Sequence, residues 1–442
     1  MTLGAPYYVP RGGVGGGAPA WSPASLGLLR AWWRGNAYSA GTAVDNSGAG
    51  NDLATFGASP TSVANYNGTA YPSMRGDGST QALQKAAFDW GAPVDQYTVW
   101  YIGTILSAPS DAVVWQYGSG ANTPYCLTLS AAQAAAKMFG PSNITTSGIE
   151  TGLQPQLVVC TWDGASQQIY NCTRPQGTAT ANVHAPLANS APFTLFAYTG
   201  GLYANADIVE AGVMRKAITA AELKQLSYYA RTKSNVATRV IVCADSIGFG
   251  PPYTGGAVSW RAGVAAACAA AGINVQMVGI VNGPDGYHRC FAGESTAMVV
   301  ANTNDNLTAT LTTDQRSRYP DVGLGSWGTN DALLNRGTDV SGTMLANAAT
   351  IMDRMKAACP DTRWLWNSCT RPTDASFFDL WPSIDGFNAG LPALCASKGI
   401  TYVPLPNTIT FKPADVHPDS SGVALIAATN SPPIIAASRS GP

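Results

Sequence analysis

The sequence predicts a two-domain protein, in which an N-terminal all-β sandwich precedes a C-terminal α/β sandwich with three layers and a parallel sheet. Short β-rich runs separated by turn signals fill the first half of the chain, and apolar strands alternate with helical segments in the second half. The first pattern is typical of sandwiches and barrels, and the second predicts a buried parallel sheet covered by helices. The pattern changes within residues 233–239. We therefore assign residues 1–20 to a Gly-rich segment, 21–235 to the β-sandwich and 236–442 to the α/β domain.

The composition excludes several classes of protein. Charged residues make up 12% of the 442 residues and the net charge is −1, whereas 46% of the residues are hydrophobic. An average globular protein has about 25% charged residues. A disordered chain needs high charge and low hydrophobicity, and a nucleic-acid partner needs a basic excess. Neither is present, so the sequence predicts a folded protein with an uncharged polar surface and no nucleic-acid partner.

No membrane partner and no standard secretion signal are expected. The longest apolar run, near Ala262–Ile273, is Ala-rich and much shorter than the roughly 20 residues of a spanning helix. Residues 1–17 lack both a basic start and an apolar core, so they do not form a standard signal peptide.

The β half is predicted from strand runs, one hairpin and one helix. Asp163-Gly164 lies between two β-rich runs and predicts a tight hairpin. The helix is expected at 218–233, where Thr219 and Glu222 have the spacing of a capping box. The clearest strand-like runs are 97–103, 112–118, 153–162 and 167–173.

This half resembles the concanavalin A-like (laminin G-like) lectin/glucanase superfamily. Four segments in order carry the resemblance: LRAWWRGNA at 29–37, VDNSGAGNDLA at 44–54, PSMRGDGSTQAL at 72–83 and the run from IVEAGVM to YYARTK at 208–233. The resemblance implies a jelly-roll sandwich of two antiparallel sheets, serving as a lectin-like binding module or as a spacer.

The α/β half is predicted from alternating elements. Strands are expected at 239–246, 273–281, 321–328, 363–368 and 400–405. Helices are expected at 260–272, 341–360 and 386–399. Functional sites in such sheets lie at the carboxyl ends of the strands.

Cofactor and metal sites are not predicted. The chain has three His and no H-E-x-x-H, no G-x-G-x-x-G after a strand, no G-x-x-x-x-G-K-[ST] and no G-x-S-x-G. The nine Cys form no C-x-x-C pair, so zinc-ribbon and thiol-redox sites are excluded. Most Cys are expected to be buried thiols. Cys160 and Cys172 flank the predicted hairpin, and a disulfide between them stays an open alternative.

One serine and one histidine remain as candidates for chemistry. Ser246 directly follows the first strand of the α/β half, and a serine nucleophile needs a neighbouring base. His417 follows the last strand, so both residues are expected at the same edge of the sheet. His288 is expected to be structural, and His184 is expected on a surface loop of the β half.

The α/β half resembles the SGNH (GDSL-type) esterase/lipase family. The resemblance implies a flavodoxin-like three-layer fold, with Ser246 as nucleophile and His417 as general base. It rests on four motifs in the family's order: ADSIGFG at 244–250, AGEST at 292–296, GTND at 328–331 and DVHP at 415–418.

The same resemblance implies an oxyanion hole. Its donors would be the backbone N–H groups of Ser246 and Gly293 and the side-chain amide of Asn330. Such preorganised donors stabilise the charge of a tetrahedral intermediate. Gly283 and Gly286 lie nearby in the sequence and compete with Gly293 for this role.

The chain departs from the family pattern at two positions. Ala244 replaces a Gly, and Ala414 replaces the Asp that usually lies three residues before the His. Asp415, two residues before His417, is the preferred acid. Asp419 or a backbone carbonyl are the alternatives.

These motifs predict a serine ester hydrolase without a cofactor, and the lectin-like half suggests a carbohydrate O-acetylesterase acting on an acetylated polysaccharide. The alternatives are a catalytically inactive binding or structural protein and a lipase- or thioesterase-type acyl hydrolase. The Gly-rich start and the low charge also suit an extracellular or phage-virion-associated protein, with homo-oligomer or virion partners.

Overall fold

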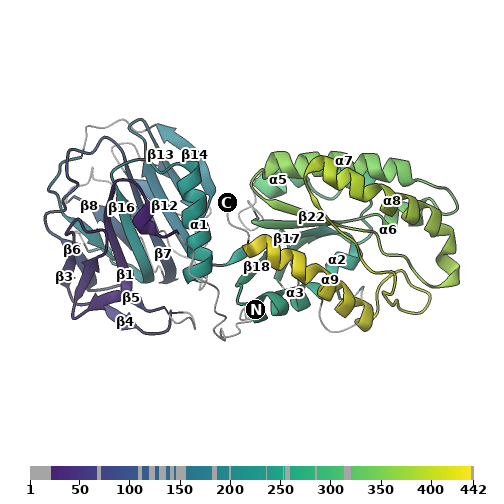
Figure 1. Ribbon diagram of the computed structural model, residues 1–442, viewed down its shortest axis with the longest axis horizontal. Helices are drawn as coiled ribbons and strands as arrows, with labels where there is room; N and C mark the ends of the chain where they lie inside the picture. Colours follow the sequence, from purple (N-terminus) through teal and green to yellow (C-terminus); the bar gives the residue numbers. More distant parts are fainter. Residues whose placement is uncertain are drawn as a thin grey trace. The chain divides into compact units, whose positions relative to one another are not determined.

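The computed structural model describes residues 21–66, 71–107, 112–118, 125–128, 136–139, 144–145, 156–181, 187–198, 201–234, 236–251, 253, 259–283, 286–312 and 320–439. The predicted Gly-rich segment 1–20 and His184 lie outside these ranges. The described chain forms two compact units that separate in the sequence between Ala237 and Thr238 (Figure 1).

The N-terminal unit is an antiparallel β structure. Within the described residues, sixteen strands join into one hydrogen-bonded network. The strands are β1 Leu29–Ser39, β2 Thr42–Asp45, β3 Leu53–Gly57, β4 Thr61–Val63, β5 Ser73–Asp77, β6 Gln81–Lys85, β7 Tyr97–Ser107, β8 Ala112–Tyr117, β9 Tyr125–Thr128, β10 Ala136–Phe139, β11 Ile144–Thr145, β12 Gln156–Trp162, β13 Ser166–Asn171, β14 Arg174–Ala181, β15 Phe193–Leu195 and β16 Asn205–Met214.

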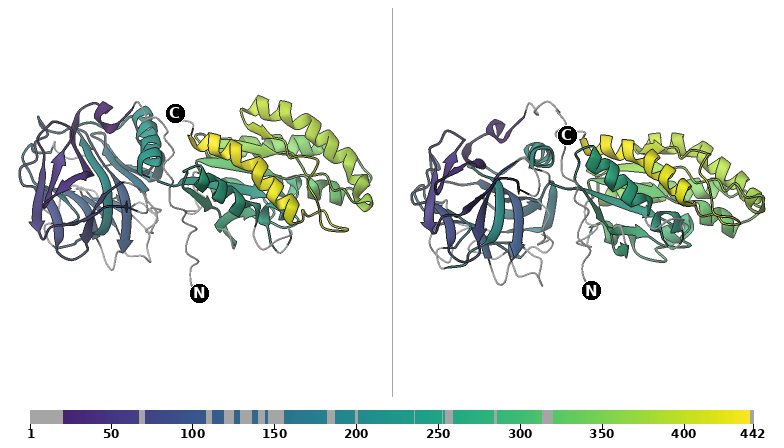
Figure 2. Two further views of the ribbon diagram at one scale, coloured as in Figure 1. Left: turned by 60° about the horizontal axis from the view of Figure 1, so that its bottom comes forward. Right: turned by 90° about the horizontal axis from the view of Figure 1, so that it is seen from below.

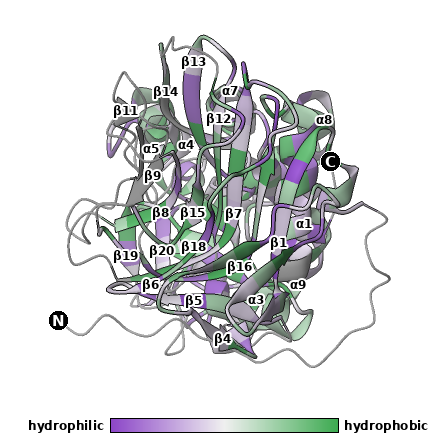
Figure 3. Cartoon of the chain, turned by 90° about the vertical axis from the view of Figure 1, so that its left-hand side faces the viewer, coloured by the Kyte–Doolittle hydropathy of each residue, from purple (hydrophilic) through white to green (hydrophobic). Residues whose placement is uncertain are grey.

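Strand β1 connects two parts of this network, one that begins with β2 and one that begins with β16. Its first half pairs with β16, and its end pairs with β2, with a register shift between Trp33 and Tyr38. Gly35 lies at this shift, where a Cβ would collide with the backbone carbonyl of Pro72. Strands from both parts contribute buried residues to one core that includes Trp115 and Trp162, so the network folds over on itself. Figure 3 shows hydrophobic stretches along β7 and β16.

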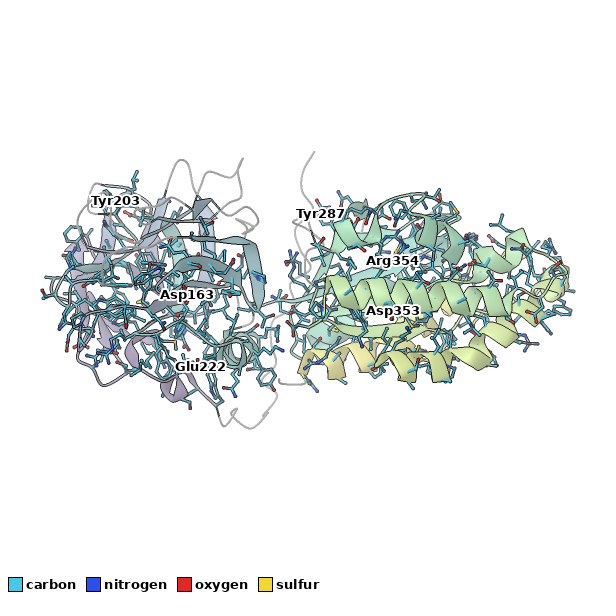
Figure 4. All side chains as sticks on the ribbon, turned by 90° about the horizontal axis from the view of Figure 1, so that it is seen from above. Asp163, Tyr203, Glu222, Tyr287, Asp353 and Arg354 are labelled. Carbon is cyan, nitrogen blue, oxygen red and sulfur yellow. The ribbon has the colours of Figure 1, made fainter. Side chains whose placement is uncertain are left out.

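The predicted hairpin and capping box are both confirmed. Strands β12 and β13 pair as an antiparallel hairpin, and the Asp163 carboxylate (labelled in Figure 4) accepts hydrogen bonds from the two backbone N–H groups of Ala165 and Ser166. Helix α1 spans Ala220–Ser234. The Thr219 hydroxyl accepts from the Glu222 N–H at 3.2 Å, and the Glu222 carboxylate accepts from the Thr219 N–H at 3.1 Å.

The C-terminal unit consists of a mixed sheet between helices. Its strands are β17 Thr238–Ala244, β18 Val275–Val278, β19 Val281–Gly283, β20 Gly286–Cys290, β21 Val322–Ser326, β22 Arg363–Asn367 and β23 Thr401–Val403. Its helices are α2 Ser246–Phe249, α3 Trp260–Ala270, α4 Thr296–Ala301, α5 Leu307–Thr312, α6 Thr329–Leu334, α7 Ser341–Ala358, the 3₁₀ helix η3 Ala375–Leu380, α8 Trp381–Lys398 and α9 Ser420–Arg439.

Six of the described strands of this sheet are parallel, and five of them lie in the spatial order β18, β17, β21, β22, β23. Numbered along the chain, this is the order 2-1-3-4-5. The prediction of a single strand at 273–281 is wrong, because the strand is interrupted at Gly279. This residue has φ +154° and packs against the His288 backbone. Strand β19 then pairs antiparallel with β20, and β20 runs beside the end of β17 in place of β18. The sheet is therefore mixed instead of wholly parallel.

Both faces of this sheet are covered by helices (Figures 1 and 2). Along β17, Val240 and Val242 pack in the core with α3 and α9, whereas Ile241 and Cys243 pack in the core with α7 and α8. Successive side chains of a strand point to opposite faces of the sheet, and here both faces are buried. The sequence of this strand is therefore a continuous apolar run.

Eight of the nine cysteines are free, buried thiols, namely Cys160, Cys172, Cys243, Cys268, Cys290, Cys359, Cys369 and Cys395. Cys160 lies in the core enclosed by the β network, whereas Cys172 lies in a second core with α1. The two side chains therefore point into different cores, and the alternative of a disulfide between them is wrong. Among the described helices, none is both long and apolar enough to cross a membrane.

Candidate active site

Ser246 lies at the carboxyl end of β17, where the strand gives way to a short helix. The Asp245 side chain caps α2 by accepting from the Ile247 N–H at 3.0 Å. Ser246 is the first residue of α2 and is 7% exposed. The turn is held from α3, because the indole of Trp260 donates to the Ile247 carbonyl at 3.2 Å and Arg261 donates to the Phe249 carbonyl at 3.0 Å.

His417 reaches this serine from the loop between β23 and α9. Its Nε2 lies 2.8 Å from the Ser246 hydroxyl, although the two residues are 171 positions apart. The loop is held by the Lys412 N–H, which donates to the His417 carbonyl at 3.0 Å, and by an antiparallel bridge between Phe411 and Pro418. The ring of Tyr253 packs beside the imidazole, with the ring centres 5.9 Å apart.

Asp415 contacts the other nitrogen of the imidazole. Its Oδ1 lies 2.6 Å from His417 Nδ1 and also accepts from the His417 N–H at 3.1 Å. Lys412 lies 3.4 Å from the second carboxylate oxygen. Burial raises the pKa of Asp415, but the hydrogen bonds and the charge of His417, together with Lys412, outweigh burial and lower this pKa below its usual value.

A backbone turn explains how Asp415 reaches the imidazole from two residues before it. Ala414 has φ +52°, which is uncommon for a residue with a Cβ. Its N–H donates to the Asp374 carboxylate at 3.2 Å. Asp419, the alternative acid, is engaged elsewhere, because it accepts from the Thr410 hydroxyl at 2.6 Å and from the Gly422 N–H at 2.8 Å at the start of α9.

The other motif residues meet at the same sheet edge. The Phe291 N–H donates to the Ala244 carbonyl at 3.1 Å, which brings the loop after β20 beside the carboxyl end of β17. Gly293 in this loop is exposed, has φ +77°, and has open space where a Cβ would lie. The Asn330 amide, at the start of α6, donates to the Glu294 carbonyl at 3.1 Å. The structure therefore brings Gly293 and Asn330 together.

The competing glycines lie elsewhere. Gly283 and Gly286 pair with each other at the turn of the β19–β20 hairpin. Because β20 runs parallel to β17 and its last residue Cys290 pairs with Ala244, Gly286 lies four residues from the carboxyl edge. This corresponds to about 13 Å along the strand.

Buried charges around this edge were not predicted from the sequence. Arg289 and Glu294 are completely buried and paired, and Asp331 accepts from the Thr296 N–H at 2.8 Å and its hydroxyl at 2.7 Å. Burial raises the pKa of Asp331. The signal was present, since Glu294 and Asp331 stand inside the AGEST and GTND motifs of a chain with few charges.

Asp245 is a further buried acid, directly before Ser246 in the chain. Burial raises its pKa to about 7, the hydrogen bond from the Ile247 N–H opposes this shift, and the nearby charges of Asp331 and Glu294 add to it.

His288 has a structural position. It is fully buried, its Nδ1 accepts from the Cys290 N–H at 3.1 Å, and burial together with the charge of Arg261 lowers its pKa to about 3. Within the described residues, no group of three or more His, Cys, Asp or Glu side chains is placed to hold a metal ion.

Several solved structures are similar to parts of this chain. A carbohydrate esterase of family 3 from Talaromyces cellulolyticus is 19% identical over 46% of this chain and 98% of that one, with a TM-score of 0.37. A family 3 carbohydrate esterase from Clostridium thermocellum is 21% identical over 46% of this chain and 100% of that one, with a TM-score of 0.36. Domain 4 of AbnA, a GH43 arabinanase from Geobacillus stearothermophilus, is 11% identical over 45% of this chain and 98% of that one, with a TM-score of 0.37.

The chain matches no protein-family model and no curated protein. Structural similarity at this level assigns no activity, so the function is argued from the residues of the site.

Proposed function

We propose that this protein is a serine ester hydrolase whose reaction takes place at Ser246. The observation that carries the proposal is the continuous hydrogen-bonded series from the Ser246 hydroxyl through His417 to Asp415, with distances of 2.8 and 2.6 Å. A serine, an imidazole and a carboxylate in this order are the arrangement that activates a hydroxyl nucleophile.

In the first half of the reaction, the Ser246 hydroxyl attacks the ester carbonyl carbon while His417 Nε2 accepts its proton. The resulting imidazolium is stabilised by the carboxylate of Asp415. The tetrahedral intermediate then collapses, the bond to the alcohol breaks, and His417 returns the proton to the leaving oxygen. In the second half, His417 deprotonates a water molecule, which releases the acid and restores Ser246.

The oxyanion of each intermediate would be bound by the N–H groups of Ser246 and Gly293 and by the Asn330 amide. Each such donor is worth about 3–4 kcal/mol in the transition state. Support comes from the hydrogen bond that the Asn330 amide donates to the Glu294 carbonyl, because Glu294 directly follows Gly293 in the chain.

The proposed substrate is an O-acetylated polysaccharide. Phe378, which is exposed, packs at a tilt against Trp381 with the ring centres 4.1 Å apart, and the Arg371 guanidinium lies 3.7 Å from the centre of the indole. This aromatic cluster follows β22 at the carboxyl edge and is linked to the His417 loop through the hydrogen bond from Ala414 to Asp374. An exposed aromatic ring suits the apolar face of a sugar ring.

Two finer assignments of fold belong to the same proposal. The strand order 2-1-3-4-5 supports a flavodoxin-like class for the C-terminal unit. The folded-over antiparallel network supports a concanavalin A-like jelly roll for the N-terminal unit, which would hold the glycan as a lectin-like module. An extracellular or virion-associated setting remains a prediction.

The experiment is acetate release from a panel of acetylated glycans, together with hydrolysis of a chromogenic acetyl ester. Wild-type protein should be active, and Ser246→Ala should be inactive on both. Ser397→Ala is the matched control, because this exposed serine of α8 bonds only within its own helix. Activity that survives in Ser246→Ala would overturn the mechanism. A wild-type protein that is inactive and that a fluorophosphonate does not label at Ser246 would favour a binding protein.

A further inference from the structure

A completely buried ion pair lies next to the loop that carries Gly293. Arg289 at the end of β20 and Glu294 are both 0% exposed and contact each other through two pairs of atoms, at 2.6 and 3.1 Å. The Glu294 carboxylate also accepts from the Trp327 indole at 3.0 Å and from the Asn304 amide at 3.0 Å. Four donors therefore fix this carboxylate in one orientation.

Hydrogen bonds also connect the segment 294–296 to the start of helix α6, where Asn330 lies. The Glu294 carbonyl accepts from the Asn330 amide at 3.1 Å. Two residues further on, Thr296 donates its N–H and its hydroxyl to the carboxylate of Asp331. Each proposed oxyanion donor thus has a buried carboxylate as its next neighbour in the sequence, Glu294 beside Gly293 and Asp331 beside Asn330.

Gly293 has no side chain to anchor it and is exposed. Among the described residues, no heavy atom outside its two chain neighbours lies within 4 Å of the position of a Cβ, and the turn around Gly293 is closed by the Glu294 N–H, which donates to the Phe291 carbonyl at 3.2 Å. The orientation of its N–H must therefore be set by its neighbours, and the residue that follows is the most firmly bound one in the loop. A buried ion pair is a weak source of stability, because desolvation offsets most of the attraction. It is a strong source of orientation, since preorganised donors need rigid support.

We propose that Arg289 and Glu294, together with the Asp331–Thr296 contact, are positioning residues that set the direction of the Gly293 N–H and the Asn330 amide. This inference rests on the proposed function, because it concerns the oxyanion hole of that reaction. The residues do not touch the substrate and act through the two loops. We therefore expect the charges of these residues to orient the two donors more than to stabilise the fold.

The principal test is Glu294→Gln, which keeps the size of the side chain and removes its charge. The number of working sites is first measured by end-point titration with a fluorophosphonate, and kcat is then expressed per titrated site. We expect kcat to fall about tenfold to a hundredfold, because a displacement of about 1 Å in a site costs up to this factor. KM for a small acetyl ester should stay within about twofold, since ground-state binding does not use these donors.

A second readout separates positioning from a loss of folded protein. Phenylboronic acid forms a tetrahedral adduct with a serine nucleophile and uses the oxyanion donors. Its Kd should rise in Glu294→Gln by the same factor by which kcat falls. If Glu294→Gln does not fold, the positioning role is tested with Asp331→Asn instead. For this variant we expect an unchanged KM and a loss of kcat per site smaller than the one expected for Glu294→Gln.

The matched control is Asp207→Asn in the β unit. Asp207 is another nearly buried carboxylate held at two points by an arginine, Arg75, at 2.7 and 2.6 Å. This variant should lower the melting temperature without changing kcat per titrated site. Wild-type kcat per site and wild-type boronic-acid affinity in Glu294→Gln would overturn the positioning role. Hydrolysis by Ser246→Ala would instead overturn the proposed function, so the two failures are distinguishable.

Discussion

The contact between Asp415 and His417 depends on the backbone of one residue, Ala414. Its positive φ turns the chain just before the acid, so that a carboxylate two residues before the histidine meets Nδ1 at 2.6 Å. The turn is held from outside by the carboxylate of Asp374. Spacing along the sequence is therefore a poor guide to this contact, whereas local backbone conformation decides it.

At this scale we predict that Asp415→Ala lowers kcat by about 10²- to 10⁴-fold. The imidazole would lose the group that orients it and stabilises its charged form. The measurement is the hydrolysis of a chromogenic acetyl ester, with KM determined in parallel.

Asp419→Ala provides the comparison for this prediction. Asp419 caps α9, so its loss should cost about 1 kcal/mol of stability and leave kcat near the wild-type value. Equal losses of kcat in the two variants would refute the assignment of Asp415.

The exposed ring of Phe378 gives a second prediction at the residue scale. Phe378→Ala should raise KM for a polymeric acetylated glycan by about 2- to 10-fold, since an aromatic contact is worth about 0.5–1.5 kcal/mol. A small acetyl ester carries no sugar ring to contact Phe378 and serves as the control substrate. An unchanged KM for the polymer, or an equal change for both substrates, would contradict a sugar contact at Phe378.

Among the elements, helix α1 shows how local sequence signals and packing act together. Its capping box supplies the first turn, and Leu223, Leu226 and Tyr229 are buried against the outer face of the β network. The capping residues were readable because they involve groups only three positions apart. The surface that the helix covers was not, because it comes from strands such as β7 and β16.

We predict that Thr219→Ala destabilises the N-terminal unit by about 1 kcal/mol through the loss of this cap. The corresponding fall in melting temperature is about 2–4 °C for a domain of this size. Thermal unfolding followed by circular dichroism is the measurement.

The control for this substitution is Thr232→Ala in the same helix. Its hydroxyl donates within the helix to the Tyr228 carbonyl, and alanine has the higher helix propensity. No loss of stability is expected there. A similar loss in both variants would show that the cap does not matter.

The loop between β23 and α9 and the loop after β20 behave differently from these helices. Each is defined by long-range partners, the first by Asp374 and Ser246 and the second by Ala244 and Asp331. Such segments have no periodic pattern, so their motifs could be found in the sequence but their conformations could not.

For the whole molecule, the low number of charges takes on a physical meaning. Several of them are buried near the carboxyl edge of the C-terminal sheet, among them Asp245, Glu294 and Asp331. Arg289 is buried as well and pairs with Glu294 and Asp305. Surface charge is therefore even lower than the 12% in the composition indicates. The buried acids also make the stability of this unit depend on pH.

We predict that Asp245 weakens the protein as the pH rises from about 4 to about 7. Its folded-state pKa is raised to about 7, whereas an unfolded Asp has a pKa of about 3.9. Between these values the folded state holds a proton that the unfolded state releases, so stability falls with increasing pH and then levels off. The free energy of unfolding at pH 5 and pH 8 is the measurement.

Asp245→Asn is the variant that isolates this group, because an asparagine can still cap α2. The stability of the wild type relative to Asp245→Asn should decline between pH 5 and pH 8 by on the order of a few kcal/mol. Parallel pH profiles for the two proteins would refute the raised pKa.

The candidate residues could be found because each stands in a short motif. Ser246 and Asn330 come at the ends of predicted strands, whereas Gly293 and His417 stand in loop motifs farther from any predicted strand. The supporting pair of Arg289 and Glu294 could not be predicted as a contact, because a buried charge and an exposed charge look the same in a sequence. The antiparallel pairing of β19 with β20 was missed for a related reason. A run of apolar residues does not show where one strand ends and the next begins with another partner.

The sequence by itself determined where the two units divide in character, which residue types stand at the strand ends, and which helix carries a capping box. These features depend on composition and on neighbours within a few positions. Only the tertiary structure decided that Asp415 contacts His417 while Asp419 caps a helix. It also decided that Cys160 and Cys172 face different cores, and that buried acids lie near Ser246. Each of these depends on the direction of a side chain relative to residues that are distant in the chain, and that direction is fixed only when the sheet, the helices and the loops pack together.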